Sequence, residues 1–126
     1  MCIRLVMTKI LIIEDDDEVR NLVKRVLIKE GHEIFEAADG VLGVSVFRKT
    51  DPDIVISDIV MPNQDGFETI EEILTIEPNT KIIVISGGGT RSPERHFKHA
   101  KDIGAIKTLA KPFTPPDLVK VVEEVL

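Results

Sequence analysis

Acidic, hydroxyl and basic side chains stand where the apolar segments of this chain end. Carboxylates follow the first and third of these segments, a serine closes the fourth, and a lysine follows the fifth. The residues are Glu14 and Asp15 after KILII (9–13), Asp58 after DIVIS (53–57), Ser86 at the end of KIIVIS (81–86) and Lys111 after AIKTLA (105–110). Oxygen ligands in this number suit Mg²⁺ better than Zn²⁺, because no thiolate or histidine accompanies them. The pattern therefore predicts a Mg²⁺ site beside a hydroxyl and an ammonium group.

The acidic run EDDD at residues 14–17 admits more than one interpretation. We prefer Glu14 and Asp15 as the acid pair, because the helix that follows still needs Asp16 or Asp17 as its cap. If the strand ends one residue later, Asp15 and Asp16 exchange roles. The four acids are also typical of a negative cluster that merely stabilises a helix N-terminus. The metal-site interpretation depends on the joint pattern, in which a suitable group follows four of five predicted strands.

Segments of strand length alternate with segments of helical periodicity, and there is no repeat and no low-complexity linker. Strands are predicted at residues 9–13, 32–38, 53–57, 81–86 and 105–110, and helices at about 19–27, 40–49, 67–74, 93–102 and 114–125. Right-handed β-α-β crossovers turn this order into an open parallel α/β sheet with helices on both faces. Ligands of such folds bind outside the carboxyl ends of the strands, where the candidate residues fall.

Composition narrows the class of protein. With 126 residues, 43% of them apolar, the chain is expected to form one domain over 1–126, with a core at about 8–126 and an extension at 1–7. Its natural start is Met1 or Met7. No apolar run approaches the ~20 residues of a membrane span, and the first residues do not resemble a signal peptide, so we expect a cytoplasmic protein. The net charge of −6 disfavours nucleic-acid binding, because a polyanion would be repelled.

Four segments together resemble the receiver domain of two-component response regulators, over essentially the whole chain. They are IIEDDDEVRNLV, VISDIVMPNQDG, VIS in the fourth strand and GAIKTLAKPF. The resemblance implies a flavodoxin-like sheet of strand order 2-1-3-4-5. It also implies that Asp58 accepts a phosphoryl group from the phosphohistidine of a partner kinase.

The resemblance further implies roles for the side chains around the acceptor. The implied metal ligands are Asp15 directly, Glu14 through water, Asp58, and the backbone carbonyl of Val60. Lys111 would pair with the phosphoryl oxygens, and the Ser86 hydroxyl would donate a hydrogen bond to one of them. These roles are physically sensible, because phosphoryl transfer needs a nucleophile, alignment and neutralised charge more than covalent help from the protein. We expect slow self-phosphorylation and dephosphorylation rather than an enzyme.

The chain departs from the family pattern near the predicted switch. Receivers usually have Tyr or Phe three residues before the Lys-Pro pair, where this chain has Thr108. Ser86 in place of the commoner Thr is a mild change, and Gly87 is expected to keep the pocket open. The glycine run 87–89 is expected to be a flexible loop, because no Gly-Lys-Ser or Gly-Lys-Thr of a phosphate-binding loop follows it.

The segment 91–107 is basic and carries His96 and His99 at a spacing of three residues. We expect exposed surface histidines rather than a metal or pH-sensing pair. The basic face is expected to meet an acidic protein partner rather than DNA. Because no segment follows the last predicted helix in this sequence, we expect a stand-alone receiver that acts through a separate protein or an onward phosphorelay.

Two function classes therefore stand beside each other. The first is a phosphoacceptor that takes its phosphoryl group from a histidine kinase or a phosphotransfer protein. The alternative is a receiver-like scaffold that binds partners independently of phosphate, which Thr108 favours slightly. A hydrolase that uses Asp58 on phosphate esters is disfavoured, because the chain has no cap domain for substrate selection. A flavin carrier is disfavoured because no Trp or Tyr is present to stack on the ring.

Overall fold

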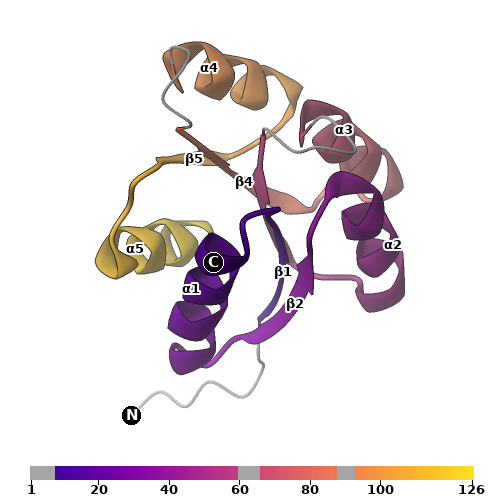
Figure 1. Ribbon diagram of the computed structural model, residues 1–126. Coiled ribbons are helices and arrows are strands. Elements are labelled where there is room, and N and C mark those ends of the chain that lie inside the picture. Colours follow the sequence, from indigo (N-terminus) through magenta and orange to yellow (C-terminus); the bar gives the residue numbers. More distant parts are fainter. Residues whose placement is uncertain (1–7, 60–65, 88–92) are drawn as a thin grey trace.

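The computed structural model describes residues 8–59, 66–87 and 93–126 (Figure 1). Five strands and five helices alternate along this part of the chain, as predicted. The strands are β1 (Lys9–Ile13), β2 (Glu33–Ala37), β3 (Ile54–Asp58), β4 (Lys81–Ser86) and β5 (Lys107–Ala110). The helices are α1 (Asp17–Lys29), α2 (Gly40–Thr50), α3 (Gly66–Ile76), α4 (Pro93–Ile103) and α5 (Pro115–Val125). Within the described ranges, none of these helices has the length and apolar character needed to cross a membrane.

The strands form one parallel sheet of order β2-β1-β3-β4-β5. Helices α1 and α5 cover one face, and α2, α3 and α4 cover the other (Figure 1). This confirms the predicted flavodoxin-like fold. The strand order reverses direction at β1 and β3, so the carboxyl ends of these two strands mark the crevice where such sheets bind ligands.

The central strand β1 is covered on both faces. Ile10 and Ile12 pack with residues of α1 and α5, whereas Leu11 and Ile13 pack with residues of α2, α3 and α4. All four side chains are fully buried. Because neither face meets water, every position after the first is apolar, which explains why residues 9–13 form a continuous apolar run instead of an alternating one.

Three strands begin later than the sequence predicts. The strand predicted at 53–57 is shifted by one residue, to Ile54–Asp58. For the other two strands, a hydrogen bond to the preceding helix explains the later start. The strand predicted at 32–38 starts one residue on, because the backbone N–H of His32 still donates to the carbonyl of Leu27 in α1 (3.1 Å). The strand predicted at 105–110 starts two residues on, because the N–H of Ala105 donates to a carbonyl of α4 (2.9 Å). In both places the last turn of the preceding helix holds the first residue of the predicted strand.

Side-chain caps define where α1 and α5 begin. Asp16 Oδ1 accepts two backbone N–H groups of α1, at 2.9 and 3.3 Å. Thr114 Oγ1 accepts the N–H of Asp117 (3.2 Å), and the Asp117 carboxylate accepts the N–H of Thr114 (3.0 Å). These bonds satisfy donors that the first helical turn leaves without partners. The cap of α1, which the sequence left open between Asp16 and Asp17, is Asp16.

Replacing Thr114 with Ala removes the hydroxyl that caps α5. We expect the free energy of unfolding to fall by about 1 kcal/mol, because the N–H of Asp117 loses its acceptor. Urea unfolding followed by circular dichroism measures the change. Thr75→Ala is the matched control, since the exposed Thr75 hydroxyl donates to the Glu71 carbonyl within α3 and caps no helix start. An equal loss of stability in both variants would contradict the role of the cap.

Candidate functional site

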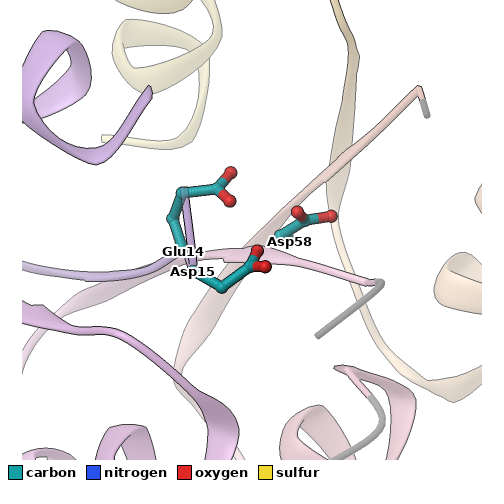
Figure 2. A group of neighbouring side chains, drawn as sticks. All are labelled: Glu14, Asp15 and Asp58. Atoms are coloured by element: carbon teal, nitrogen blue, oxygen red, sulfur yellow. The ribbon is translucent and has the colours of Figure 1, made fainter. Parts of the chain in front are cut away.

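Three carboxylates meet at the carboxyl ends of β1 and β3. Glu14 and Asp15 follow β1, and Asp58 is the last residue of β3. The strands pair with Ile13 opposite Ser57, so Glu14 and Asp58 emerge side by side. One carboxylate oxygen from each of the three acids lies within 4.8 Å of the other two. Figure 2 shows the carboxylate of Asp15 pointing toward Asp58.

The neighbouring Asp16 is directed away from this cluster. Its carboxylate is occupied by the N-terminal backbone of α1, while its own N–H donates to Glu14 Oε2 (3.1 Å). The cap therefore fixes the register of the acidic run, and Glu14 and Asp15 are the pair that faces Asp58. Glu14 is buried and Asp15 is exposed, so the cluster is open to solvent from one side.

Lys111 joins the cluster from the end of β5. Its ammonium lies 2.8 Å from Glu14 Oε1 and 3.1 Å from Asp58 Oδ2. The sequence analysis paired Lys111 only with phosphoryl oxygens and missed its ion pair with Glu14. No signal in the sequence indicates this pair, because the two residues belong to strands that are not neighbours in the sheet.

The backbone of Lys111 is held against β4. Its N–H donates to the carbonyl of Ser86 (2.8 Å). A Cβ on Gly87 would lie 2.7 Å from both the backbone nitrogen and the backbone oxygen of Lys111. The glycine thus makes room for the Lys111 backbone, and the expectation that it also keeps the pocket open stays a prediction.

Two further predicted site residues are Ser86 and Val60, and Thr108 occupies the position where the family usually has an aromatic residue. Ser86 is the last residue of β4 and is buried, at the same sheet edge as Asp58. The backbone carbonyl of Val60 lies outside the described residues, so its role stays a prediction. Thr108 lies in β5 opposite Val84 and is half-buried.

Burial sets the charge balance of the cluster. Desolvation raises the pKa of Glu14 to about 7, even though the ion pair with Lys111 opposes the shift, and the negative charge of Asp58 adds to it. Burial alone would lower the pKa of the Lys111 ammonium, but its contacts with Glu14 and Asp58 outweigh burial and raise that pKa. Among the side chains that the structure describes, one ammonium faces three carboxylates, so this cluster is short of positive charge. An all-oxygen ligand set with this deficit fits Mg²⁺.

Arg20 is a contact of the cluster that the sequence analysis did not single out. Its Nη1 donates to the backbone carbonyl of Glu14 at 2.8 Å. A signal for it exists in the sequence, because a cation near the N-terminus of a helix is disfavoured by the helix dipole and needs nearby acceptors to compensate. Asp17 and Glu36 are among those acceptors.

His99 of the basic segment is not part of the acidic cluster. The side chain of His96 is outside the described residues. His99 is exposed, as expected, and its ring stacks on Phe67 of α3 with centroids 4.1 Å apart. Lys98 and Lys101 of α4 are also exposed. The contact between His99 and Phe67 joins α4 to α3.

The comparisons with known proteins agree with this geometry. Residues 10–123 match the model of the response regulator receiver domain. Sporulation initiation phosphotransferase F of Bacillus subtilis is 31% identical over 118 residues, 94% of this chain and 93% of that protein. The chemotaxis protein CheY of Thermotoga maritima is 36% identical over 118 residues, 93% of this chain and 96% of that protein. The solved structure of the chemotaxis response regulator CheY4 of Vibrio cholerae has a TM-score of 0.87 at 33% identity, covering 96% of this chain and 100% of that chain.

The raised pKa of Glu14 makes the stability of the metal-free protein depend on pH. A carboxyl group with a pKa of about 7 in the folded state and 4.5 in the unfolded state contributes its full stability below pH 4.5, and the contribution is lost as the pH rises through 7. Glu14→Gln cannot ionise and avoids this loss. We expect it to be more stable than the parent at pH 8 by about 2 to 3 kcal/mol and to match the parent near pH 4.5, in urea unfolding with EDTA.

Glu36→Gln is the control, because the pKa of Glu36 is shifted in the opposite direction from that of Glu14. The hydrogen bond from Lys24, together with Arg20, holds the pKa of Glu36 below its usual value. Its contribution to stability is therefore present above the unfolded pKa and lost as the pH falls. We expect Glu36→Gln to be less stable than the parent at pH 8. If Glu14→Gln loses stability at pH 8 in the same way, the raised pKa of Glu14 is wrong.

Proposed function

Because the chain belongs to the receiver-domain family of response regulators, we propose that Asp58 accepts a phosphoryl group from the phosphohistidine of a histidine kinase or a phosphotransfer protein. Phosphorylation-based signalling is general in this family. One observation carries the proposal for this chain: the Lys111 ammonium lies 3.1 Å from Asp58 within a cluster of three carboxylates. A nucleophile and a cation able to neutralise incoming phosphoryl oxygens are therefore adjacent.

Asp58 supplies the nucleophile, and its neighbours align and neutralise the transferring group. A carboxylate oxygen of Asp58 attacks phosphorus in line with the phosphorus–nitrogen bond, which breaks as the new phosphorus–oxygen bond forms. The Lys111 ammonium pairs with the phosphoryl oxygens, and the Ser86 hydroxyl donates a hydrogen bond to one of them. Mg²⁺, when bound, spreads the negative charge of the transferring group. We assign Asp15 to the ion directly, with Glu14 through water, Asp58 as a further ligand and the Val60 carbonyl completing the set.

Phosphorylation of Asp58 changes the affinity of the protein for a downstream partner. Receivers of the CheY type are signalling proteins, not classical enzymes. Phosphoaspartate adds negative charge and acceptor oxygens at the sheet edge, and a partner can recognise that change. We propose that one receiver domain of about 8–126 acts in the cytoplasm, between an upstream phosphoryl donor and a separate downstream protein.

Thr108 favours a second candidate, a scaffold that engages its partners without phosphate. Receivers usually have Tyr or Phe three residues before the Lys-Pro pair. This chain has the half-buried Thr108 of β5 at that position. The acid cluster and Lys111 argue for the phosphoacceptor instead, because a scaffold does not require them.

Intact-protein mass spectrometry after incubation with Mg²⁺ and acetyl phosphate tests the proposal. We expect a phosphate adduct on the wild-type protein and an adduct reduced to background in Asp58→Asn, because the amide is not a nucleophile for phosphorus. Asp53→Asn is the matched control, since Asp53 is exposed and precedes β3 at the opposite end of that strand. Its adduct should equal that of the wild type.

Two results would count against the phosphoacceptor. An undiminished adduct in Asp58→Asn would place the acceptor elsewhere. A folded wild-type protein that binds Mg²⁺ but forms no adduct with acetyl phosphate or phosphoramidate would favour the phosphate-independent scaffold.

Calorimetric titration with Mg²⁺ tests the assignment of the acid pair. We expect Asp15→Asn to weaken binding by at least about tenfold, because one oxygen ligand loses its charge. Asp17→Asn should have little effect, since the Asp17 side chain is 80% exposed and pairs with Arg20 instead of facing the cluster. The reverse order of effects would show that the register of the acidic run is wrong.

A further inference from the structure

We propose that Arg20, near the start of α1, is a positioning residue for the acidic loop, residues 14–16, which joins β1 to α1. The inference rests on the proposed function, because the loop carries Glu14 and Asp15, the side chains assigned to Mg²⁺. Arg20 acts on the backbone between them. Its Nη1 donates to the carbonyl oxygen of Glu14 at 2.8 Å, and this carbonyl belongs to the peptide unit that joins Glu14 to Asp15.

The guanidinium of Arg20 reaches acceptors in three parts of the fold. Besides the Glu14 carbonyl of the acidic loop, Nε donates to Glu36 Oε1 of β2 at 3.2 Å, and Nη2 donates to Asp17 Oδ1 of α1 at 2.5 Å. The Arg20 side chain is only 16% exposed, and its charge-assisted bonds to the Glu14 carbonyl and to Glu36 are partly buried, whereas the bond to Asp17 is exposed. The planar fork of an arginine can serve separate acceptors at fixed angles, which the single ammonium of a lysine cannot.

Both peptide units that flank Glu14 are held in place. The N–H of Glu14 donates to the carbonyl of Ala37 in β2 at 3.1 Å, and the carbonyl of Glu14 accepts from Arg20. One peptide unit further on, the N–H of Asp16 donates to Glu14 Oε2 at 3.1 Å. Because a peptide unit is planar, fixing the Glu14 carbonyl also fixes the position of the Asp15 Cα, and with the Asp16 N–H held as well, both peptide units that flank Asp15 are restrained.

This restraint matters because the carboxylates of the cluster repel one another when no cation lies between them. Repulsion would drive the exposed Asp15 away from the buried Glu14 and Asp58, whose oxygens lie within 4.8 Å of it. A hydrogen bond from Arg20 to the Glu14 backbone carbonyl opposes that movement without itself occupying a carboxylate oxygen of the cluster. The ligands are then in place before the ion arrives, and less free energy is lost in ordering the loop.

Lys24 provides the comparison that separates positioning from charge. Its ammonium lies 2.7 Å from Glu36 Oε2, so it shares that carboxylate with Arg20, but no described contact joins it to the acidic loop. Lys24→Met therefore removes one positive charge and one ion pair of the same network. Loss of a positive charge near a cation site by itself strengthens Mg²⁺ binding. Charge and positioning thus predict opposite signs for Arg20→Met.

Calorimetric titration of the wild type, Arg20→Met and Lys24→Met with Mg²⁺ is the first test. The chain has no Trp and no Tyr, so its own fluorescence is a poor reporter and calorimetry serves instead. We expect Arg20→Met to bind about tenfold more weakly and Lys24→Met to bind as the wild type does or more tightly. Methionine retains an apolar stem of similar reach, so packing along the side chain is preserved in both variants.

Amide hydrogen exchange of the metal-free proteins is a second readout that needs no Mg²⁺. We expect the N–H of Asp16 to exchange faster in Arg20→Met than in the wild type or Lys24→Met, because the loop loses its backbone restraint. Amides of β3 should keep their exchange rates in all three proteins, which shows that the fold is intact.

Three results would overturn the inference. The first is a folded Arg20→Met protein that binds Mg²⁺ with wild-type affinity and whose Asp16 N–H exchanges at the wild-type rate. This result would refute the role of Arg20 while leaving the proposed metal site intact. Equal weakening in Lys24→Met would assign the effect to the ion-pair network instead of the loop contact. A wild-type protein that binds no Mg²⁺ would overturn the proposed metal site, and this inference would fall with it.

Discussion

The repulsion among the carboxylates of Glu14, Asp15 and Asp58 is the constraint around which this end of the sheet is organised. Parallel strands bring them together, because neighbouring strands of such a sheet end at the same edge. The fold compensates from two sides. Lys111 follows β5 and bridges Glu14 and Asp58, while Arg20 of α1, which also pairs with Glu36 of β2, holds the backbone between Glu14 and Asp15. Burial still raises the pKa of Glu14, so positive charge is in deficit among the described side chains of the cluster, and this deficit favours a cation site.

The backbone around Asp58, the proposed phosphoryl acceptor, is closely packed, and this packing is a second constraint. The N–H of Gly66, the first residue of α3, donates to the carbonyl of Ile59 at 2.9 Å. A Cβ on Gly66 would lie 2.5 Å from the Cα of Ile59 and 2.6 Å from the carbonyl oxygen of Asp58. Helix α3 therefore begins directly against the backbone of Asp58 and Ile59. It continues to α4 through the ring stack of Phe67 on His99. In a core packed this closely, a shift of the Asp58 backbone must be accommodated by α3.

Much of the fold was predictable because it rests on short-range patterns. A strand covered on both faces must be apolar throughout, so residues 9–13 and 81–86 are recognisable without any tertiary information. The first residues of β2 and β5 could not be predicted in this way, because His32 and Ala105 make hydrogen bonds to the preceding helices. Apolar pattern does not distinguish a helix that continues for one more turn from a strand that has begun. The cap of α1 was narrowed to two adjacent acids, and only the backbone geometry of the loop selects Asp16.

The sequence by itself determined which residues reach the site, because the place of a residue just after a strand fixes the sheet edge at which it emerges. That was enough for Glu14, Asp58 and Lys111, whatever the order of the strands. Only the tertiary structure decided which of them touch. Lys111 lies beyond β5, which is separated from β1 by two strands, β3 and β4, yet its long side chain reaches Glu14. Arg20 of α1 donates to the Glu14 carbonyl while its Nε donates to Glu36 of β2, a strand that follows α1 in the chain. Such pairings depend on strand order and side-chain direction, and no local pattern of residues encodes either.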